Sequence, residues 1–495
     1  MLSLFSRIGK LLITILVVGS CALISGEGVF AATSTVPVPV NVAGGDGHGI
    51  AAWSDGTVTG WGYNKYGQVG DGTSIHQFVP KRIDGLANIV QVAAARDISF
   101  ALSKDGEVWA WGDGYSPYVS GDVVLQYQKR GLPVKMDGLE QVSNIDTNGF
   151  AGVAVHNDGT ATLWYPTHDP TDPMTVTTKY VSLKGVSNAS SAVILDYTVL
   201  ILDCDGKVSS LSIYNTVYGR YRSENELPAV QPIRSSISTI VSSGRDAFLL
   251  NKNGTVSLWN EESKKTATIS GFTGISNIQT GYKRLYALNS NGSIWQWNYN
   301  AGTKAKPFQV KSLSNIADIW GSTGQFGYAL RKDGKLMAWG DGYYTGMATG
   351  SGSPTIDKGK ETAYAVNVQT PLSWTVKGQS ISFYGTSGII NGKLYVPFTS
   401  VFEALGVKIS SKSELDPKQN GRSTSIKTFA YEDKTLVIKG GSPAEVLLNG
   451  KNTGQTVNIQ VMSNTTMYPL ETICEQLGIS LQWNKTTGEV VLGGA

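Results

Sequence analysis

One spacing recurs along most of this chain: a turn dipeptide is followed, six positions after its first residue, by a large apolar side chain. The dipeptides are Asp-Gly or Asn-Gly, which suit a two-residue type I′ hairpin because both central residues of that turn need φ > 0. They begin at Asp55, Asp105, Asp158, Asp205, Asn253, Asn291 and Asp333, and the large side chains are Trp61, Trp111, Trp164, Leu211, Trp259, Trp297 and Trp339. Seven copies of one spacing indicate a repeated structural unit.

The repeat has the length and the residue alternation of a propeller blade. Successive turns are from 38 (Asn253 to Asn291) to 53 (Asp105 to Asp158) residues apart. Repeats of about 40–50 residues with four strands each are typical of β-propellers. We therefore predict a mainly β fold whose largest part is a seven-bladed β-propeller over residues 36–368, with the tryptophans packed between blades. Either residues 35–42 or residues 362–368 could supply the strand that closes the ring.

Three stretches of the propeller region carry a family resemblance. Residues 61–72 (WGYNKYGQVGDG), with 101–112 and 328–340, resemble the repeat of the regulator of chromosome condensation family, whereas no glycine follows Trp164, Trp259 or Trp297. The resemblance implies a seven-bladed propeller. Nuclear members of that family exchange guanine nucleotides on a small GTPase and bind chromatin, and secreted bacterial members include β-lactamase inhibitors that bind through loops on one face. Because a fold does not fix a function, we expect only loop-mediated binding to apply to a secreted bacterial-type chain.

A second domain is expected over residues 372–495. A phrase of strand, proline and short helix occurs at 394–406 (LYVPFTSVFEALG) and returns at 467–478 (MYPLETICEQLG). This predicts a small α+β domain with an internal duplication. The paired phrases resemble the copper amine oxidase N-terminal-like domain. Copper needs imidazole or thiolate ligands and residues 372–495 contain no histidine, so we expect a stalk or attachment module without copper.

The N-terminal residues predict secretion. Arg7 and Lys10 precede an apolar run at 11–18, and small residues precede a cut before Ala32, which is the order of a signal peptide over residues 1–31. An alternative is a lipid anchor at Cys21, which the downstream cleavage site disfavours. No later stretch approaches the roughly 20 continuous apolar residues of a transmembrane helix. We expect an extracellular protein, with association with the cell envelope as the alternative.

Catalytic and cofactor signatures are missing from the sequence. The four histidines, His48, His76, His156 and His168, do not pair at metal-ligand spacing, and there is no H-E-x-x-H, G-x-S-x-G or phosphate-binding loop. The formal charge of +3 gives no broad attraction to nucleic acid. We expect no catalytic residues, no cofactor, no metal and no nucleic-acid partner.

The connections that follow the tryptophans are the candidate functional site, because equivalent loops open on one face of the ring. Tyrosine among small polar residues is typical of evolved binding surfaces. The candidate partner-binding residues are Tyr63, Tyr66, His76, Tyr115, Tyr118, Tyr165, His168, Tyr214, Tyr218, Tyr299, Tyr343 and Tyr344. We predict a non-catalytic protein that binds an extracellular protein or a cell-wall component through this face. The alternatives are a structural protein of the cell envelope or spore surface and a secreted carbohydrate-active enzyme.

Overall fold

The computed structural model describes residues 37–112, 130–168, 176–218, 227–299, 305–340, 365–382, 385–399, 401–415, 423–440, 443–462 and 465–493.

Residues 39–367 form seven consecutive four-stranded antiparallel sheets, each built from strands in sequence order. The sheets are β1 (Pro39–Gly44), β2 (His48–Trp53), β3 (Val58–Gly62) and β4 (Gln77–Arg82); β5 (Ile89–Ala95), β6 (Ile98–Ser103), β7 (Val108–Gly112) and β8 (Arg130–Lys135); β9 (Val142–Thr147), β10 (Gly152–His156), β11 (Ala161–His168) and β12 (Val176–Ser182); β13 (Ala189–Ile194), β14 (Thr198–Asp203), β15 (Val208–Ser212) and β16 (Gln231–Arg234); β17 (Ile237–Ser243), β18 (Asp246–Asn251), β19 (Val256–Asn260) and β20 (Thr266–Thr268); β21 (Ile275–Gly281), β22 (Arg284–Asn289), β23 (Ile294–Asn298) and β24 (Phe308–Gln309); and β25 (Ile316–Trp320), β26 (Phe326–Arg331), β27 (Leu336–Gly340) and β28 (Val366–Asn367). A five-residue π-helix, η1 (Tyr214–Tyr218), follows β15.

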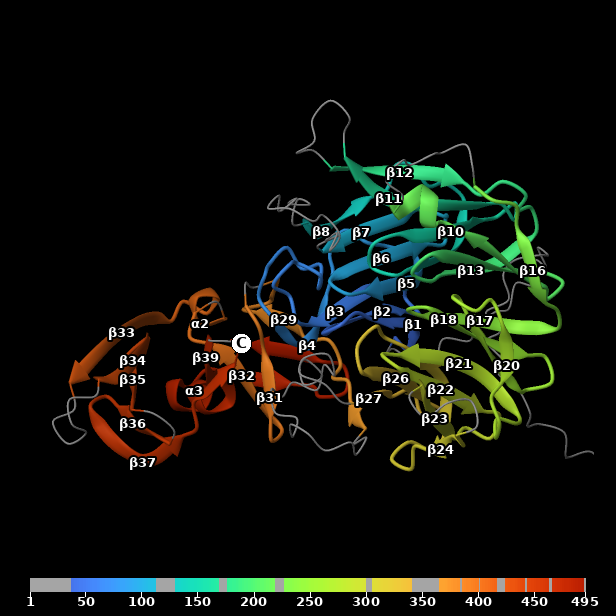
Figure 1. The fold of residues 1–495 in the computed structure, drawn as a ribbon. Coiled ribbons are helices and arrows are strands. Elements are labelled where there is room, and N and C mark those ends of the chain that lie inside the picture. The colour runs from blue at the N-terminus through green and yellow to red at the C-terminus, as the bar shows by residue number, and fades with distance from the viewer. Residues whose placement is uncertain are drawn as a thin grey trace, which may run out of the picture.

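The sheets are arranged around a common centre, with the first strand of each sheet innermost (Figure 1). The inner strands of consecutive sheets contact one another, and β1 contacts β25 and β26, so the ring is closed. At the closure Gly44 N donates to Gly321 O at 3.1 Å, and Gly44 forms a parallel bridge with Ser322. Neither of the two expected closing segments crosses to another sheet, because β1 belongs to the first sheet and β28 pairs with β27 of the last.

The turns differ from the predicted type I′ form. In the first sheet Gly56 N donates to Trp53 O at 2.8 Å and Trp53 N donates to Thr57 O at 2.9 Å, which encloses three loop residues rather than two. Gly56 has φ +77°, whereas Asp55 is not among the described residues with positive φ. The Asp55 carboxylate accepts the Thr57 N–H at 3.0 Å and so caps the turn. This is the type I turn followed by a left-handed glycine that closes three-residue hairpins.

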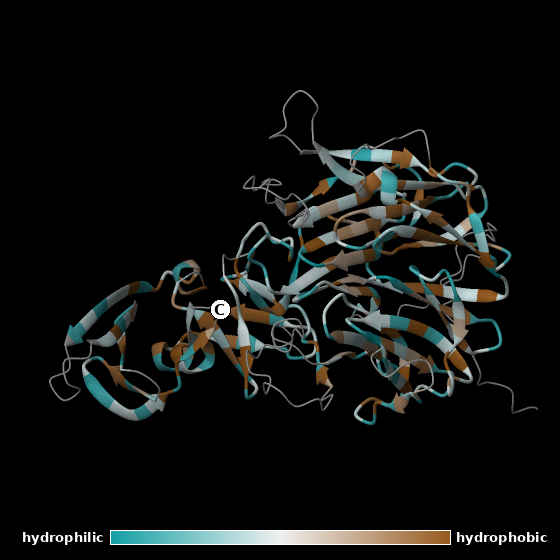
Figure 2. Ribbon diagram, in the orientation of Figure 1, coloured by the Kyte–Doolittle hydropathy of each residue, from teal (hydrophilic) through white to brown (hydrophobic). Residues whose placement is uncertain are grey.

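The repeated tryptophans are core residues, as predicted. Trp61, Trp111, Trp259, Trp297 and Trp339 are at most 2% exposed, Trp164 is 4% exposed, and Leu211 is buried at the equivalent position. Each tryptophan faces the preceding sheet; Trp61, for example, contacts Tyr328 of the last sheet edge-on at 5.6 Å between ring centroids. Apolar residues run along the strands and hydrophilic ones concentrate in connections (Figure 2). A buried aromatic side chain removes about 150–250 Å² from water, so these layers hold the sheets together.

The second domain is small and α+β, as predicted. Its sheets comprise β29 (Ser373–Val376), β30 (Gln379–Ile381), β40 (Leu481–Trp483) and β41 (Glu489–Leu492); β31 (Gly388–Ile390), β32 (Lys393–Pro397), β38 (Gln460–Met462) and β39 (Thr465–Pro469); and β33 (Lys408–Leu415), β34 (Ser423–Tyr431), β35 (Lys434–Lys439), β36 (Ala444–Leu448) and β37 (Lys451–Val457). Helices α2 (Val401–Ala404) and α3 (Leu470–Leu477) follow β32 and β39. These two strands pair antiparallel with each other, so the duplicated phrases lie side by side. Gly478, with φ +73°, ends α3 in the left-handed cap that glycine favours.

The two domains contact each other through the outer strand of the first sheet. The first four side chains of β4 are buried, whereas most side chains of the outer strands β16, β20 and β24 are exposed. Phe78, 2% exposed, lies in a cluster with Tyr395, Met462 and Met467 of the second domain. Gln77 Nε2 donates to Gly385 O, and Phe78 N donates to Thr386 Oγ1, both at 3.3 Å. The second domain therefore packs on the propeller beside β4 (Figure 1).

No helix in the described part of the chain is both long and apolar enough to cross a membrane.

Candidate functional site

One face of the propeller gathers two kinds of connection. Because strands within each sheet alternate in direction, the hairpin between the first and second strands leaves from the same end as the connection between the third and fourth. We call this end the hairpin face. Its seven hairpins span residues 45–47, 96–97, 148–151, 195–197, 244–245, 282–283 and 321–325. The connections after the tryptophans, which the sequence indicates as the binding loops, open on the same face.

Hydrogen bonds join five of the seven pairs of neighbouring hairpins. The contacts are Asp46 N to Arg96 O (3.0 Å), Asn148 Nδ2 to Leu195 O (2.9 Å), Asp196 N to Gly244 O (3.1 Å), Tyr282 N to Gly324 O (2.7 Å) and Gly324 N to Gly45 O (3.2 Å). The Thr323 hydroxyl also donates to the Asp46 carboxylate at 2.7 Å and accepts the Arg96 N–H at 3.0 Å. Neighbouring hairpins therefore fix each other's positions, and the face is a preorganised surface, which lowers the entropy cost of binding.

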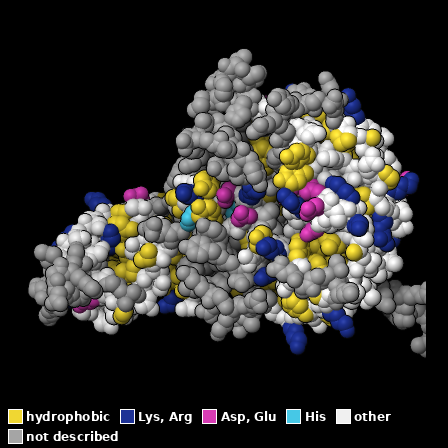
Figure 3. Space-filling model, viewed as in Figure 1, with side chains coloured by type: hydrophobic (Ala, Val, Ile, Leu, Met, Phe, Trp, Pro, Cys, Tyr) yellow, Lys and Arg dark blue, Asp and Glu magenta, His cyan; other side chains and the backbone are white. Residues whose placement is uncertain are grey.

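Aromatic and charged side chains stand on these hairpins. Tyr282 is 49% exposed and Tyr214, on the following connection of the fourth sheet, is 52% exposed. Arg96, Arg245 and Lys283 are exposed basic residues at the tips of three hairpins. Acidic residues stand among them, and Figure 3 shows basic and acidic side chains interspersed on one face of the molecule rather than gathered into a single field.

Tyr214 and Arg245 form a cluster with Tyr197 and Asp196 between the fourth and fifth sheets. The rings of Tyr197 and Tyr214 meet edge-on at 5.3 Å between centroids. The Arg245 guanidinium lies over the Tyr197 ring at 5.3 Å and 3.5 Å from an oxygen of the Asp196 carboxylate. The stacking holds the planar guanidinium in place and leaves donors for a bound carbonyl or carboxylate group.

The buried carboxylate of Glu261 bonds to the backbone of Tyr197 in this cluster. Glu261 is 4% exposed, and its Oε1 accepts the Tyr197 N–H at 2.9 Å. Burial raises the pKa of Glu261, and the hydrogen bond from the Tyr197 N–H opposes that rise. Glu261 thus positions the Tyr197 hairpin and is itself too buried to meet a partner.

A second aromatic cluster lies on the connection after Trp61. The Tyr63 ring stacks on His76 at 4.7 Å and meets the Tyr66 ring at 6.2 Å. His76 Nδ1 accepts the Asn64 N–H at 2.9 Å, which leaves Nε2 as the protonated nitrogen of the neutral ring. Partial burial lowers the pKa of His76. Three predicted residues are therefore brought together, next to the strand that contacts the second domain.

Other predicted residues fall into two groups. Tyr165 is 2% exposed because β11 continues four residues beyond Trp164, which makes Tyr165 a strand residue paired with Lys179. Tyr299 packs on Trp297 and Phe248 at 5.6 and 5.1 Å, and burial raises the pKa of its hydroxyl well above the ordinary value. The prediction that these two side chains meet a partner is corrected: both are packing residues. Tyr115, Tyr118, Tyr343 and Tyr344, and the side chains of His168 and Tyr218, lie outside the described residues.

The residues that sequence reasoning missed stand on the first hairpin of each sheet. Tyr197, Arg245, Tyr282 and Lys283 occupy two- or three-residue turns between apolar strands. The turns lack the repeated motif that marks the opposite end of each sheet. The signal that could have identified these residues is the position of the turns, which is equivalent in successive repeats and lies just before the second strand.

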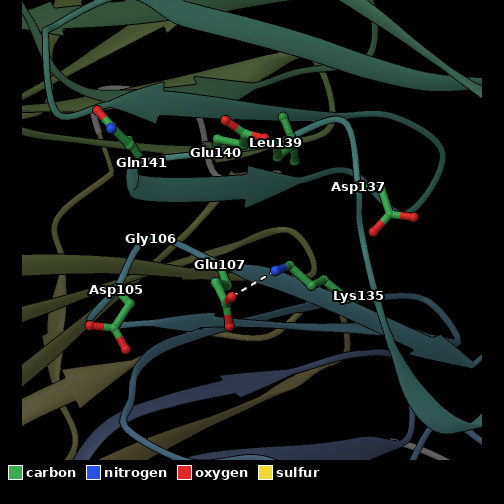
Figure 4. A pocket seen from close by; sticks show the side chains of 8 residues that line it. All are labelled: Asp105, Gly106, Glu107, Lys135, Asp137, Leu139, Glu140 and Gln141. Atoms are coloured by element: carbon green, nitrogen blue, oxygen red, sulfur yellow. Dashed lines mark hydrogen bonds and ion pairs between the residues drawn. The ribbon is translucent and has the colours of Figure 1, made fainter.

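A hollow on the opposite face has a different character. It measures about 410 Å³ and lies between the second and third sheets, lined by Asp105, Gly106, Glu107, Lys135, Asp137, Leu139, Glu140 and Gln141 (Figure 4). Lys135 Nζ lies 2.6 Å from Glu107 Oε1. Among the described residues no group of three or more His, Cys, Asp or Glu side chains is arranged to hold a metal ion. We assign no cofactor to this hollow.

Comparison with known proteins identifies the building blocks. Residues 55–102 and 89–116 match the regulator of chromosome condensation (RCC1) repeat, and residues 375–492 match the copper amine oxidase N-terminal domain. Similar proteins include the Ultraviolet-B receptor UVR8 of Arabidopsis thaliana, 39% identical over 75 residues, which are 15% of this chain and 17% of UVR8. The guanine nucleotide exchange factor SRM1 of Saccharomyces cerevisiae is 28% identical over 142 residues, which are 25% of this chain and 29% of SRM1.

Solved structures similar to this chain include Prp20p from Saccharomyces cerevisiae, with a TM-score of 0.48, 15% identity, and coverage of 67% of this chain and 86% of that one. The matched stretches span less than a third of UVR8 and of SRM1. The chain therefore carries RCC1 repeats within its propeller, followed by a copper amine oxidase N-terminal domain.

Proposed function

We propose that this protein is a secreted, non-catalytic binding protein whose hairpin face engages a protein partner. The observation that carries the proposal is the set of hydrogen-bonded hairpins on one face, with Tyr214, Tyr282 and Arg245 exposed there. Tyrosine and arginine are enriched among the residues that dominate protein–protein binding energy. A rigid surface that presents these residues binds a partner without the entropy cost of ordering a loop.

The relatives agree with binding and leave the activity open. The names of the similar proteins record a receptor and an exchange factor, so the repeat itself does not determine one reaction. One structure report on Prp20p describes its binding to Gsp1p and histones, and another describes its complex with Kap60. Both reports concern Prp20, and we argue from its protein binding to protein binding by this chain.

The second domain is proposed as the attachment module. Its contact with β4 lies at the outer strand of the first sheet, and Arg96, Arg245 and Tyr282 on the hairpins are exposed with this domain in place. Attachment through this domain would hold the propeller in a fixed orientation at the cell envelope.

Site-specific photo-crosslinking tests the proposal. A benzoylphenylalanine is placed at Tyr282 on the hairpin face or at Val90, which is 46% exposed and lies at the opposite end of the inner strands. The purified chain is incubated with culture medium or with envelope extract from the producing cells and irradiated. We expect one protein species to be crosslinked from position 282 and absent from position 90. Equal products from both positions, or none from 282, would reject the hairpin face as the binding site.

A further inference from the structure

Residues with positive φ carry different types of side chain on the two faces of the propeller. Among the described propeller residues, seven non-glycine residues have positive φ: Asn88, Arg96, Gln141, Ser236, Lys264, Lys283 and Asn315. Asn88, Gln141, Ser236 and Asn315 precede inner strands on the face opposite the hairpins, and all four are uncharged. The three on the hairpin face, Arg96, Lys264 and Lys283, are all basic.

This difference does not follow from the needs of the turn. Glycine and asparagine adopt positive φ most readily, and a long basic side chain gains nothing from that backbone conformation. Gly244, at φ +60°, shows that an equivalent hairpin of the same ring does use glycine. A sparsely populated conformation that is kept with a particular side chain is a pointer to function.

None of the three basic side chains forms an ion pair within the described residues, but Lys264 Nζ donates to Thr198 Oγ1 at 3.3 Å and lies over the Trp259 ring. Arg96 and Lys283 are exposed and form no ion pair there, and Lys283 Nζ lies 5.0 Å from the centroid of the neighbouring Tyr282 ring. Three acidic residues of the hairpins already have partners: Asp46 accepts the Thr323 hydroxyl, Asp97 accepts a hydrogen bond from Gln68 Nε2 at 2.6 Å, and Asp196 pairs with Arg245. Donors for an incoming anion therefore remain, beside an exposed aromatic surface.

We propose that the hairpin face recognises an acidic segment of its protein partner, with carboxylates meeting Arg96 and Lys283 and an apolar side chain packing on Tyr282. This rests on the proposed function and gives the chemistry of the partner. Carboxylate groups bind a guanidinium through paired hydrogen bonds, and the tyrosine ring supplies the apolar contact that a purely electrostatic site would lack.

The test is a selection of short random peptides displayed on phage against the full chain, followed by affinity measurement with the selected peptides. The variant Arg96→Asn/Lys283→Asn removes both charges with the residue that best tolerates positive φ, so its fold is retained. Lys104→Asn/Lys332→Asn is the matched control, because it removes the same charge from exposed positions on the opposite face.

We expect selected peptides to be enriched in Asp and Glu, and to bind roughly tenfold more weakly to Arg96→Asn/Lys283→Asn but normally to the control. Selected peptides without acidic enrichment, or equal losses in both variants, would overturn the proposal. Inorganic polyphosphate is a second probe: if it binds the hairpin face while acidic peptides do not, an anionic polymer and not a protein segment is recognised. Peptides that lack acidic residues but lose binding in Tyr282→Ala would overturn the charge assignment while leaving protein binding by this face intact.

Discussion

The Asp146 carboxylate accepts a hydrogen bond from the Ile194 N–H, 2.9 Å away, across the junction between the inner strands of the third and fourth sheets. Burial raises the pKa of Asp146 from 3.8 to about 7, and the hydrogen bonds from Ile194 N–H and Thr147 N–H only partly oppose that rise. The folded propeller thus holds this side chain in an environment that favours its protonated form.

This relationship predicts a pH-dependent stability. Because the folded pKa is above the unfolded one, the folded state retains a proton that the unfolded state loses, so stability falls as the pH rises from about 4 to about 7. Asp146→Asn keeps an acceptor for Ile194 N–H and removes the titration. We expect the variant to gain on the order of 2–4 kcal/mol over the natural chain near neutral pH and nothing near pH 4. Urea unfolding across this range measures it, and parallel curves for the two proteins would contradict it.

His48 is expected to act in the opposite direction. It is 0% exposed, its Nε2 lies 2.8 Å from Ser99 Oγ, and burial lowers its pKa from 6.5 to about 3. The buried ring is neutral, so its contribution is fully present above about pH 6.5 and is lost as the pH falls towards 3. In His48→Gln the free energy of unfolding should fall less steeply below pH 6.5, by up to about 1.4 kcal/mol per pH unit. Because the contributions of Asp146 and His48 oppose each other between about pH 4 and 6.5, Asp146→Asn/His48→Gln should follow the profile of the natural chain there. A slope of His48→Gln that equals the slope of the natural chain would refute the assignment to His48.

The sequence predicted the sheets and the core because both depend on local patterns. A turn dipeptide and a tryptophan six positions later define a strand pair wherever they occur, and the buried state of Trp61 and Trp339 follows from size and repetition. The predicted type I′ turn was wrong because aspartate is compatible with both turn types. Only the φ values in the structure distinguish a single left-handed Gly56 from a type I′ pair.

The candidate site was less predictable, since it depends on three-dimensional relationships. Tyr165 follows a tryptophan as a loop residue would, yet it lies in a strand because β11 is longer than the equivalent strands. Arg245 and Tyr197 are distant in sequence and meet only because adjacent hairpins bond to each other. No local sequence pattern identifies Phe78 as an interdomain residue, because an apolar residue in an outer strand is an ordinary feature of a strand.

Phe78 should be the main determinant of the contact between domains. Truncating a buried phenylalanine costs about 3–5 kcal/mol, and the cluster with Tyr395 and Met467 would lose its central side chain. In Phe78→Ala we expect the second domain to separate from the propeller, seen as a larger radius of gyration in small-angle scattering and faster proteolysis near residues 368–372. Phe308→Ala is the matched control, because Phe308 stands in outer strand β24 and is 50% exposed. A compact Phe78→Ala would show that the contact does not depend on this cluster.

The fourth sheet offers a test of how the tryptophan layer is built. Trp61, Trp164 and Trp339 stand opposite Gly49, Gly152 and Gly327 on the neighbouring strand. Trp111 stands opposite Ser99, Trp259 opposite Ala247 and Trp297 opposite Leu285, so five of the six tryptophans face a small residue.

At the exceptional position Leu211 stands opposite Val199, and both are buried. A tryptophan here would meet the valine side chain where most other sheets provide a small residue. Leu211→Trp should therefore destabilise the propeller by about 1–3 kcal/mol although it restores the repeated residue. Val199→Ala/Leu211→Trp should recover part of that loss, because the pair then copies Ala247 and Trp259. Urea unfolding of the two single variants and the double variant gives the coupling energy between positions 199 and 211. Strictly additive effects would mean that the residue across the strand does not decide which large side chain the layer accepts.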